Sequence, residues 1–221
     1  MLAERILFID AEALVIDKPA GLPVTPVRDG SLSLDNYLQS LAFGFKRWPQ
    51  PVHRLDRDTS GCLLLARNPK AHKRYAAAFE AGEVAKLYLA VLDGEPAADE
   101  GVIDLPLAKV SSREAGWRIV ADPKGKPAVT RWQVVARIEG RALLAFRPTT
   151  GRTHQLRVHT ATGLGIPIAG DPVYGKGGAA MLLHAAALTL PRTGKAPIHA
   201  AAPLPPSFGA FMGRWSPGDA A

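Results

Sequence analysis

The chain has 221 residues, 47% hydrophobic and 21% charged, which is enough for one substantial core. Its 27 Lys and Arg against 20 Asp and Glu leave a net charge of +7, which favours a polyanionic partner such as nucleic acid. The single cysteine, Cys62, excludes an internal disulfide and a multi-cysteine zinc site, and it indicates a reducing cytoplasm. We expect no targeting segment, because no basic region precedes a sustained apolar run at the N-terminus. We also expect no membrane span, because no apolar run approaches ~20 residues.

The first elements in chain order are a strand, a turn and a buried strand. Ala13 to Asp17 is a short apolar run, and the Pro and Gly of Lys18 to Gly21 end it in a turn. A short helix is expected around Ser33 to Leu41. Cys62 to Ala66 is apolar at every position, which is typical of a strand buried on both faces.

A helix and another strand follow. Asn68 is a favoured N-cap residue and the next residue is proline, so a helix is predicted from about Pro69 to Ala81. Lys86 to Asp93 alternates in the manner of a strand, which places Tyr88 on the face opposite Leu87. The tyrosine hydroxyl is thereby separated from the Leu87 face.

The second half of the chain is rich in strand patterns joined by short turns. These patterns lie at Gly116 to Ala121, Ala128 to Arg137 and Ala142 to Arg147. A helix is expected over Thr153 to Thr162, with Thr153 as its cap and Gly163 as its end. The pattern predicts an α+β fold with a largely antiparallel mixed sheet and flanking helices. We expect a single domain over residues 1–221, with its core at about 5–208.

The polar stretch His53 to Gly61 comes directly before the buried strand, and loops on rigid elements commonly carry catalytic side chains. Within it, Asp56 lies between Arg54 and Arg57, whose charges would keep its carboxylate ionised. An ionised carboxylate suits a nucleophile or a base. The alternative is a surface turn held by the Asp side chain.

A second polar cluster, Gly151 to His159, places cationic and amide groups on the first turns of the predicted helix. The positive end of the helix dipole adds to them, and together they could hold a phosphate or a catalytic carboxylate. The alternative is an amphipathic helix with a solvated basic face.

Two tryptophans follow basic residues, Trp48 after Arg47 and Trp132 after Arg131. Either ring could stack on an RNA base. Core packing explains a tryptophan at least as often, so the sequence leaves both alternatives open.

Other site chemistries have weaker support. Asp56 and Asp58 resemble the paired carboxylates of magnesium-dependent haloacid-dehalogenase-type phosphatases, but no later acidic metal-binding pair is evident. His154 and His159 are five residues apart, so one helix face does not present both as zinc ligands. The glycine fingerprint of dinucleotide sites is missing from the sequence. We therefore expect no metal and no cofactor.

Four ordered motifs resemble those of the RluA-type pseudouridine synthases. His53 to Gly61 is similar to the family's HRLDxxTSG motif, and Lys86 to Val91 is similar to its tyrosine-bearing strand. Gly151 to His159 matches its GRxHQLRVH helix, and Gly165 to Gly175 fits its G-x-P-I-x-G-D-x-x-Y-G loop. The resemblance spans residues 18 to about 205. It implies the pseudouridine synthase fold with a central active-site cleft, and isomerisation of uridine in structured RNA.

The resemblance also implies roles for particular residues. Asp56 would be the essential carboxylate that starts chemistry at the glycosidic bond. Tyr88 would pack against the target uracil and help to remove the C5 proton, and Arg157 would pair with Asp56. Substrate contacts are implied at Arg54, His154, Gln155 and Leu156.

Base flipping fits these roles, because a uridine inside a folded RNA must leave its stack before C1′ or C5 can be reached. Arg54 would occupy the space that the uridine leaves. The order of events at Asp56 stays open, since it could attack C1′ or take the C2′ proton after the base departs. Neither order needs a redox partner or a metal.

The resemblance further suggests what surrounds the catalytic domain. Ile6 to Pro19 looks like the start of that domain, so we expect no S4-type RNA-binding domain. The expected partner is ribosomal or transfer RNA, and the expected state is a cytoplasmic monomer without an obligate protein partner. A non-catalytic RNA-binding module with the same fold and the magnesium-dependent phosphatase remain the rival functions.

Overall fold

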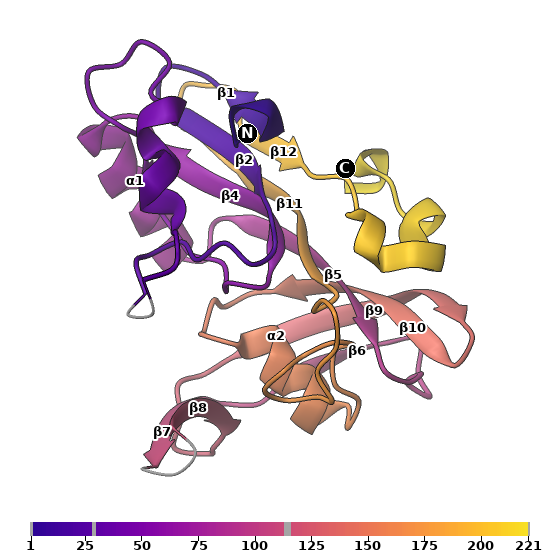
Figure 1. The fold of residues 1–221 in the computed structure, drawn as a ribbon. Helices are drawn as coiled ribbons and strands as arrows, with labels where there is room; N and C mark the ends of the chain where they lie inside the picture. Colours follow the sequence, from indigo (N-terminus) through magenta and orange to yellow (C-terminus); the bar gives the residue numbers. More distant parts are fainter. Residues whose placement is uncertain (1, 28–29, 113–115, 221) are drawn as a thin grey trace. The chain divides into compact units, whose positions relative to one another are not determined.

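The computed structural model describes residues 2–27, 30–112 and 116–220, with the backbone alone at 112 and 220 (Figure 1). The chain folds into two compact units, each with its own buried apolar core. The first unit comprises Met1–Lys86, His184–Leu204 and Ser216–Ala221, and the second comprises Leu87–Leu183 and Pro205–Trp215. The single domain expected from the sequence stays a prediction.

The first unit is built on a mixed sheet. Its strands are β1 (Ile6–Ile9), β2 (Ala13–Lys18), β3 (Gln50–Pro51), β4 (Ser60–Ala66), β11 (Leu183–Leu190) and β12 (Ile198–Ala201). The order is β1-β2-β4-β11, with β3 added to β4 and β12 added to β11. The β4–β11 pair is parallel and the other pairs in this unit are antiparallel.

Strand β4 is buried at all seven of its residues, because β2, β3 and β11 pair with it and side chains cover both faces. The prediction of a buried strand at Cys62 to Ala66 is therefore confirmed. The strand predicted at Ala13 to Asp17 is also confirmed as β2, which is one residue longer.

Helix α1 (Pro69–Glu80) follows the capping rules that predicted it. The Asn68 side chain accepts a hydrogen bond from the backbone N–H of Ala71 at 2.9 Å. Ala71, Tyr75 and Ala78 form the buried face of the helix, and they share a core cluster with residues of β2 and β4.

The second unit contains an antiparallel sheet in the order β5-β10-β9-β6. Its strands are β5 (Ala85–Leu92, whose first two residues belong to the first unit), β6 (Glu100–Asp104), β9 (Val129–Ile138) and β10 (Arg141–Pro148). Glu139 and Gly140 form the predicted turn between β9 and β10, with φ of 51° and 74°. Three predicted strands, Lys86 to Asp93, Ala128 to Arg137 and Ala142 to Arg147, are thereby confirmed.

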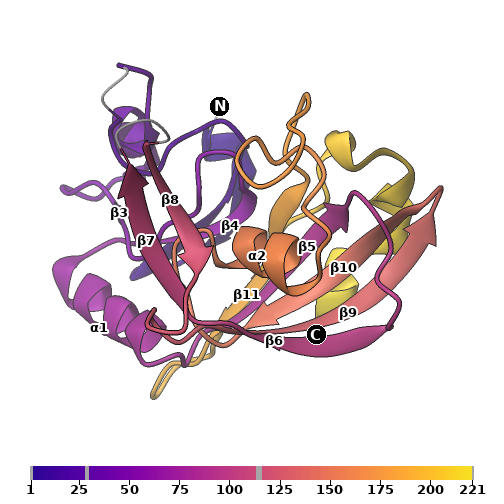
Figure 2. The same cartoon turned by 90° about the horizontal axis from the view of Figure 1, so that it is seen from below.

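Strands β7 (Leu107–Ser112) and β8 (Gly116–Ala121) form a separate two-stranded hairpin in the second unit (Figure 2). The predicted strand at Gly116 to Ala121 is confirmed as β8, whereas β7 was not predicted. Leu107 and Ile119 anchor the hairpin, because both are buried in a small cluster with Ala128 and Val158.

The helix predicted over Thr153 to Thr162 is shorter and less regular. Helix α2 (Gln155–Val158) continues as a π-helical turn, η3 (His159–Gly163), which ends at the predicted glycine. Thr153 is not the cap, because His154 occupies that position in a left-handed conformation with φ of 52°. The turn before the helix is instead held by Gln155, whose Oε1 accepts from the backbone N–H of Arg152 at 3.0 Å.

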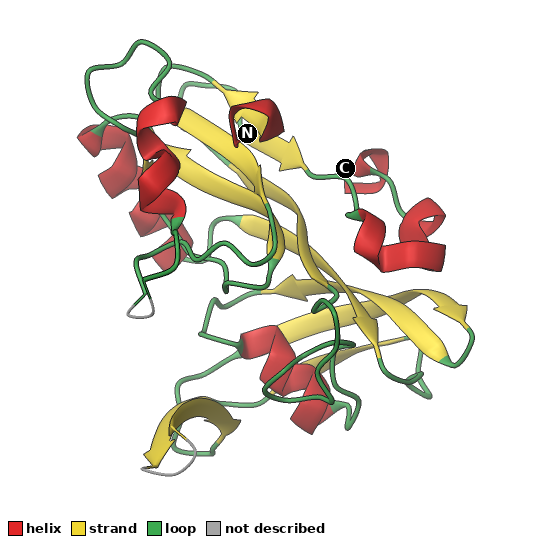
Figure 3. Cartoon of the chain, in the orientation of Figure 1, coloured by secondary structure: helices red, strands yellow, loops and turns green. Residues whose placement is uncertain are grey.

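The remaining described elements are 3-10 helices, and Figure 3 shows how few helical residues accompany the strands. The short helix expected around Ser33 to Leu41 is one of them, with Ser33 at its N-cap position. Their bounds are η1 Leu2–Arg5, η2 Leu34–Leu41, η4 Pro206–Arg214 and η5 Pro217–Ala220. The predicted α+β class with a largely antiparallel sheet is confirmed. Of the helices in the described ranges, none is long and apolar enough to cross a membrane.

Candidate functional site

Asp56 lies in the first unit, in the loop between β3 and β4, and it is half-buried. The backbone N–H of Thr59 donates to the carbonyl oxygen of Asp56 at 3.1 Å, which closes a tight turn. Arg54 and Arg57 are exposed on either side of it. Because the loop leads into the fully buried β4, the carboxylate is mounted on a rigid element.

His53 ties the start of this loop to β4. The backbone N–H of Leu64 donates to His53 Nε2 at 3.0 Å, so the ring takes the place of a strand carbonyl where the β3–β4 ladder ends. The ring also stacks on Phe79 of α1, with centroids 4.2 Å apart. Burial lowers the pKa of His53 to about 3, so the ring is neutral and can accept this hydrogen bond at physiological pH.

Lys18 ties the other end of the loop. Its side chain is fully buried, and Nζ donates to the carbonyl oxygens of Pro19, Leu22 and Arg57 at 2.8, 2.9 and 3.0 Å. Burial lowers its pKa from 10.5 to about 8, and the nearby carboxylates of Asp58, Asp56 and Asp17 limit the decrease. The sequence predicted a turn at Lys18 but no role for its ammonium.

The end of the motif serves packing between strands. Ser60 Oγ lies 2.8 Å from His184 Nδ1, and burial lowers the pKa of His184 to about 4, which keeps it neutral. Gly61 has φ of 105°, and a Cβ at this position would collide with the carbonyl oxygen of Ala185 on β11. A glycine is therefore required where β4 and β11 approach each other.

Tyr88 and Leu156 lie in the second unit and pack in the same core cluster. Tyr88 is half-buried and pairs across the sheet with Phe146 of β10. Leu87, Leu89 and Val91 are buried on the other face of β5, so the predicted separation of Tyr88 from Leu87 is confirmed.

Arg157 forms a buried ion pair with Asp171. Its Nε donates to Asp171 Oδ2 at 2.7 Å, and one terminal nitrogen donates to Oδ1 at 2.8 Å. Burial favours a higher pKa for Asp171, but hydrogen bonds from Arg157 and from the backbone N–H groups of Tyr174 and Val173 lower it below 3.8. The pairing of Arg157 with Asp56, which belongs to the other unit, stays a prediction.

Gln155 uses the whole of its amide within the protein. Its Oε1 accepts from Thr150 Oγ1 and from the N–H of Arg152, and its Nε2 donates to Val129 O and Thr130 Oγ1. These four bonds match the amide's donors and acceptor sites. The geometry supports a role in positioning α2 and gives no support to a direct substrate contact by Gln155.

His154 contacts the loop that follows η3. Its Nδ1 lies 2.9 Å from the Tyr174 hydroxyl, which also accepts from the backbone N–H of Ile119 in β8. The Arg157 guanidinium lies 5.1 Å from the centroid of the Tyr174 ring. Tyr174 thus joins the hairpin, His154 and Arg157.

The structure brings together the predicted residues of the second unit, while Asp56 and Arg54 belong to the first. Sequence reasoning missed Lys18, Asp171 and Tyr174 as partners. The last two stand in the matched G-D-x-x-Y-G loop, which is the signal that could have found them. Across residues 2–27, 30–112 and 116–220, no group of three or more His, Cys, Asp or Glu could hold a metal ion.

Residues 12–162 match the family model described as RNA pseudouridylate synthase, a range that includes Asp56, Tyr88 and Arg157. The chain belongs to the RNA pseudouridylate synthase family. The RluA-type resemblance is therefore confirmed, and this pseudouridine synthase is an isomerase that acts on RNA.

Relatives and solved structures agree with this assignment. The pseudouridine synthase is 66% identical over 212 residues to an uncharacterized RNA pseudouridine synthase of Zymomonas mobilis, covering 94% of this chain and 97% of that protein. It is 37% identical to the ribosomal large subunit pseudouridine synthase D of the same organism, covering 78% of this chain and 56% of the relative. The structure of human RNA pseudouridylate synthase domain containing 4 matches with a TM-score of 0.80 and 27% identity, covering 96% of this chain and 93% of that one.

Proposed function

We propose that this pseudouridine synthase isomerises uridine in structured ribosomal or transfer RNA, with Asp56 as its essential carboxylate. The anchoring of the Asp56 loop carries this assignment, because Lys18 holds the carbonyl of Arg57 and His53 holds the N–H of Leu64. A carboxylate that acts on one atom of a ribose needs such pre-organisation. The ribosomal substrate in the name of the synthase D relative supports ribosomal RNA as one target.

The proposed reaction rearranges bonds within one nucleotide. The N1–C1′ bond breaks, the uracil turns, and C5 bonds to C1′; the C5 hydrogen leaves as a proton and N1 gains one. Asp56 either attacks C1′ or removes the C2′ proton after the base departs, and both orders regenerate its carboxylate. Because the product is an isomer of the substrate, the reaction balances without an oxidant or a reductant.

The other roles follow from charge and exposure. We assign Arg157 the role of ion-pair partner of Asp56. Asp171 would fix the plane of the Arg157 guanidinium through its two hydrogen bonds. Tyr88 would pack on the uracil and help to remove the C5 proton. Arg54 is exposed, which suits a side chain that enters the RNA stack in place of the flipped uridine.

His154 and Leu156 are assigned to substrate contacts beside Arg157, and Gln155 to positioning the helix that carries them. We propose a monomer that needs no metal and no cofactor. Its single cysteine, Cys62, is buried, and burial raises the pKa of its thiol to about 12. The side chain is therefore an unreactive thiol, and we propose the reducing cytoplasm as the location of the protein.

The test is release of tritium from total RNA that carries 5-tritiated uridine, made in cells that lack this protein. The wild type should release tritium with a chelator present throughout. Asp56→Asn should lower the rate by roughly 10⁴-fold, the scale of losing a residue that takes part in bond making. Unchanged release by this variant would refute the assigned role of Asp56.

Asp58→Asn is the matched control, because Asp58 is half-buried in the same loop. It should keep most of the activity. If the chelator abolished tritium release by the wild type, the proposed independence from metal would be refuted. If the wild type bound RNA but released no tritium, and Asp56→Asn bound it equally well, the chain would act as a binding module.

A further inference from the structure

The β7–β8 hairpin of the second unit has a buried root and an exposed outer part. Leu107 and Ile119 are buried, whereas Trp117, two residues before Ile119 in β8, is 50% exposed. Trp132 is buried at 7% exposure and belongs to the core of the same unit. Core packing therefore accounts for the presence of Trp132, but it does not account for the exposed Trp117.

Side chains of two elements hold the Trp117 ring in place. Lys109 Nζ lies 5.1 Å from its centroid, and the His154 ring lies 5.3 Å away at an interplanar angle of 31°. Lys109 pairs with Ile119 across the hairpin and Ser111 pairs with Trp117, so these side chains share one face. The exposed indole is thus an ordered aromatic surface with a cation beside it.

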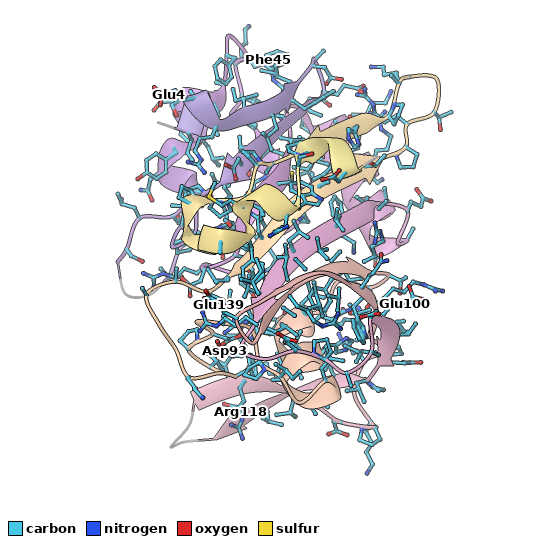
Figure 4. The ribbon with its side chains drawn as sticks, turned by 90° about the vertical axis from the view of Figure 1, so that its right-hand side faces the viewer. Glu4, Phe45, Asp93, Glu100, Arg118 and Glu139 are labelled. Atoms are coloured by element: carbon cyan, nitrogen blue, oxygen red, sulfur yellow. The ribbon has the colours of Figure 1, made fainter. Side chains whose placement is uncertain are left out.

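The charge of the hairpin favours a polyanion. Lys109 and Arg118 are exposed, and Figure 4 shows the Arg118 side chain projecting from the hairpin. Neither β7 nor β8, as far as their residues are described, contains Asp or Glu. An exposed aromatic ring next to cations is the arrangement that binds unpaired bases and their phosphates.

The hairpin is also tied to the segment that carries Arg157. The backbone N–H of Ile119, two residues after Trp117, donates to the Tyr174 hydroxyl at 3.0 Å. Tyr174 contacts both His154 and Arg157. A base that stacks on Trp117 would therefore lie against the element assigned to the reaction.

We propose that Trp117 is a stacking platform for an unpaired base that flanks the target uridine, and that Lys109 contacts a phosphate of the same RNA. This inference rests on the proposed action on RNA. It makes the hairpin a reader of loop structure, since a base within a continuous duplex cannot leave its stack to reach the indole without breaking a pair.

The test compares two synthetic RNAs of equal length, a hairpin with an unpaired uridine-containing loop and a blunt duplex. Trp117→Ala should weaken binding of the loop RNA by roughly 5- to 100-fold, the range for removing one aromatic–base stack, and should leave duplex binding nearly unchanged. Trp117→Phe should retain most of the affinity. Lys109→Gln should weaken binding of both RNAs and lower the salt slope by about 1.

Val102→Ala is the matched control, because Val102 is a large hydrophobic side chain of the same unit and is 56% exposed. It should leave loop binding unchanged. Thermal unfolding of each variant separates a binding defect from a folding defect. Equal losses for Trp117→Ala on loop and duplex, or equal losses for Val102→Ala and Trp117→Ala, would overturn the stacking role.

The two proposals fail in different ways. Tritium release by the wild type together with unchanged loop binding by Trp117→Ala would remove the platform and keep the isomerase. Selective loss of loop binding by Trp117→Ala, with no tritium release by the wild type, would support the platform and remove the assigned reaction. If the hairpin instead bound a protein partner, neither Trp117→Ala nor Lys109→Gln would weaken RNA binding.

Discussion

The Asp56 loop of the first unit and the α2 segment of the second hold their polar residues in different ways. Around Asp56, the ties run to backbone groups, since Lys18 donates to three carbonyl oxygens and His53 accepts one N–H. Around Arg157, side chains bind one another, as in the Arg157–Asp171 pair. The loop therefore depends on two anchoring side chains, His53 at its start and Lys18 outside it, whereas the α2 segment depends on each member of its network.

The two arrangements should also differ in their response to pH. The Asp56 loop is held by the Lys18 ammonium, whose pKa is about 8, so alkaline conditions remove the charge of this group. The α2 segment is held by the ion pair of Arg157 with Asp171. The pKa of Asp171 lies below 3.8, so only acid breaks the pair. Substitutions at each anchor can separate these two behaviours.

Asp171→Asn should cause the largest loss of stability. It leaves the buried Arg157 guanidinium without its counter-charge, and breaking a buried pair from one side costs about 3–5 kcal/mol. The Asn carbonyl oxygen can still accept from the N–H groups of Val173 and Tyr174, so the local turn survives. The free energy of unfolding in urea at pH 7 measures the effect.

Asp122→Asn is the control for Asp171→Asn. Asp122 Oδ1 accepts from the N–H of Lys124 at 2.8 Å in an exposed turn, so its replacement should change stability by about 0.5 kcal/mol or less. The pKa of Asp171 is lower in the folded chain than its ordinary value of 3.8, so the ionised pair stabilises the wild type at pH values above 3.8. This contribution is lost as the pH falls through the pKa of Asp171 in the folded chain. Similar effects of the two substitutions would contradict a buried charge pair.

Lys18→Met should remove a pH dependence of stability on the alkaline side. Between pH 8 and 10.5 the unfolded chain keeps the Lys18 proton while the folded chain releases it, so the wild type gains stability as the pH rises. The shift corresponds to about 3 kcal/mol at 1.36 kcal/mol per pKa unit. Urea unfolding at pH 7.5 and 10.5, taken as the difference between wild type and variant, measures this gain.

Lys73→Met is the control for Lys18→Met, because Lys73 is exposed on α1. Its stability relative to the wild type should stay constant over the same pH window. A constant difference for Lys18→Met as well would show that the buried ammonium does not titrate there, and the loop would then lack its alkaline response.

Local rules explain what the sequence predicted well. The cap of α1 is formed by Asn68 and Ala71, which are three residues apart, so the residues themselves carry the signal. Strand β4 is buried on both faces, and this leaves an uninterrupted apolar run at Cys62 to Ala66. The candidate residues came from motifs rather than from such rules.

Long-range pairing explains what the sequence did not predict. Lys18 and Arg57 are 39 positions apart, and the fold alone brings them together. Strand β11 is rich in Ala, which has low strand propensity, and it is fixed by pairing with β4 and β12. The left-handed His154 has the same explanation, because the tertiary contacts of Gln155 override the local preference for a Thr cap.

Tyr174→Phe should give the smallest effect and probes the link between the hairpin and the α2 segment. It removes the hydroxyl that accepts from Ile119 N–H and contacts His154, which should cost about 1–2 kcal/mol in urea unfolding. Tyr37→Phe, a half-buried tyrosine of η2, should cost only a few tenths of a kcal/mol. If the side-chain network positions Trp117 as proposed, Tyr174→Phe should also weaken binding of the loop RNA more than binding of the duplex. Loss of stability with unchanged loop binding would instead assign Tyr174 to packing alone.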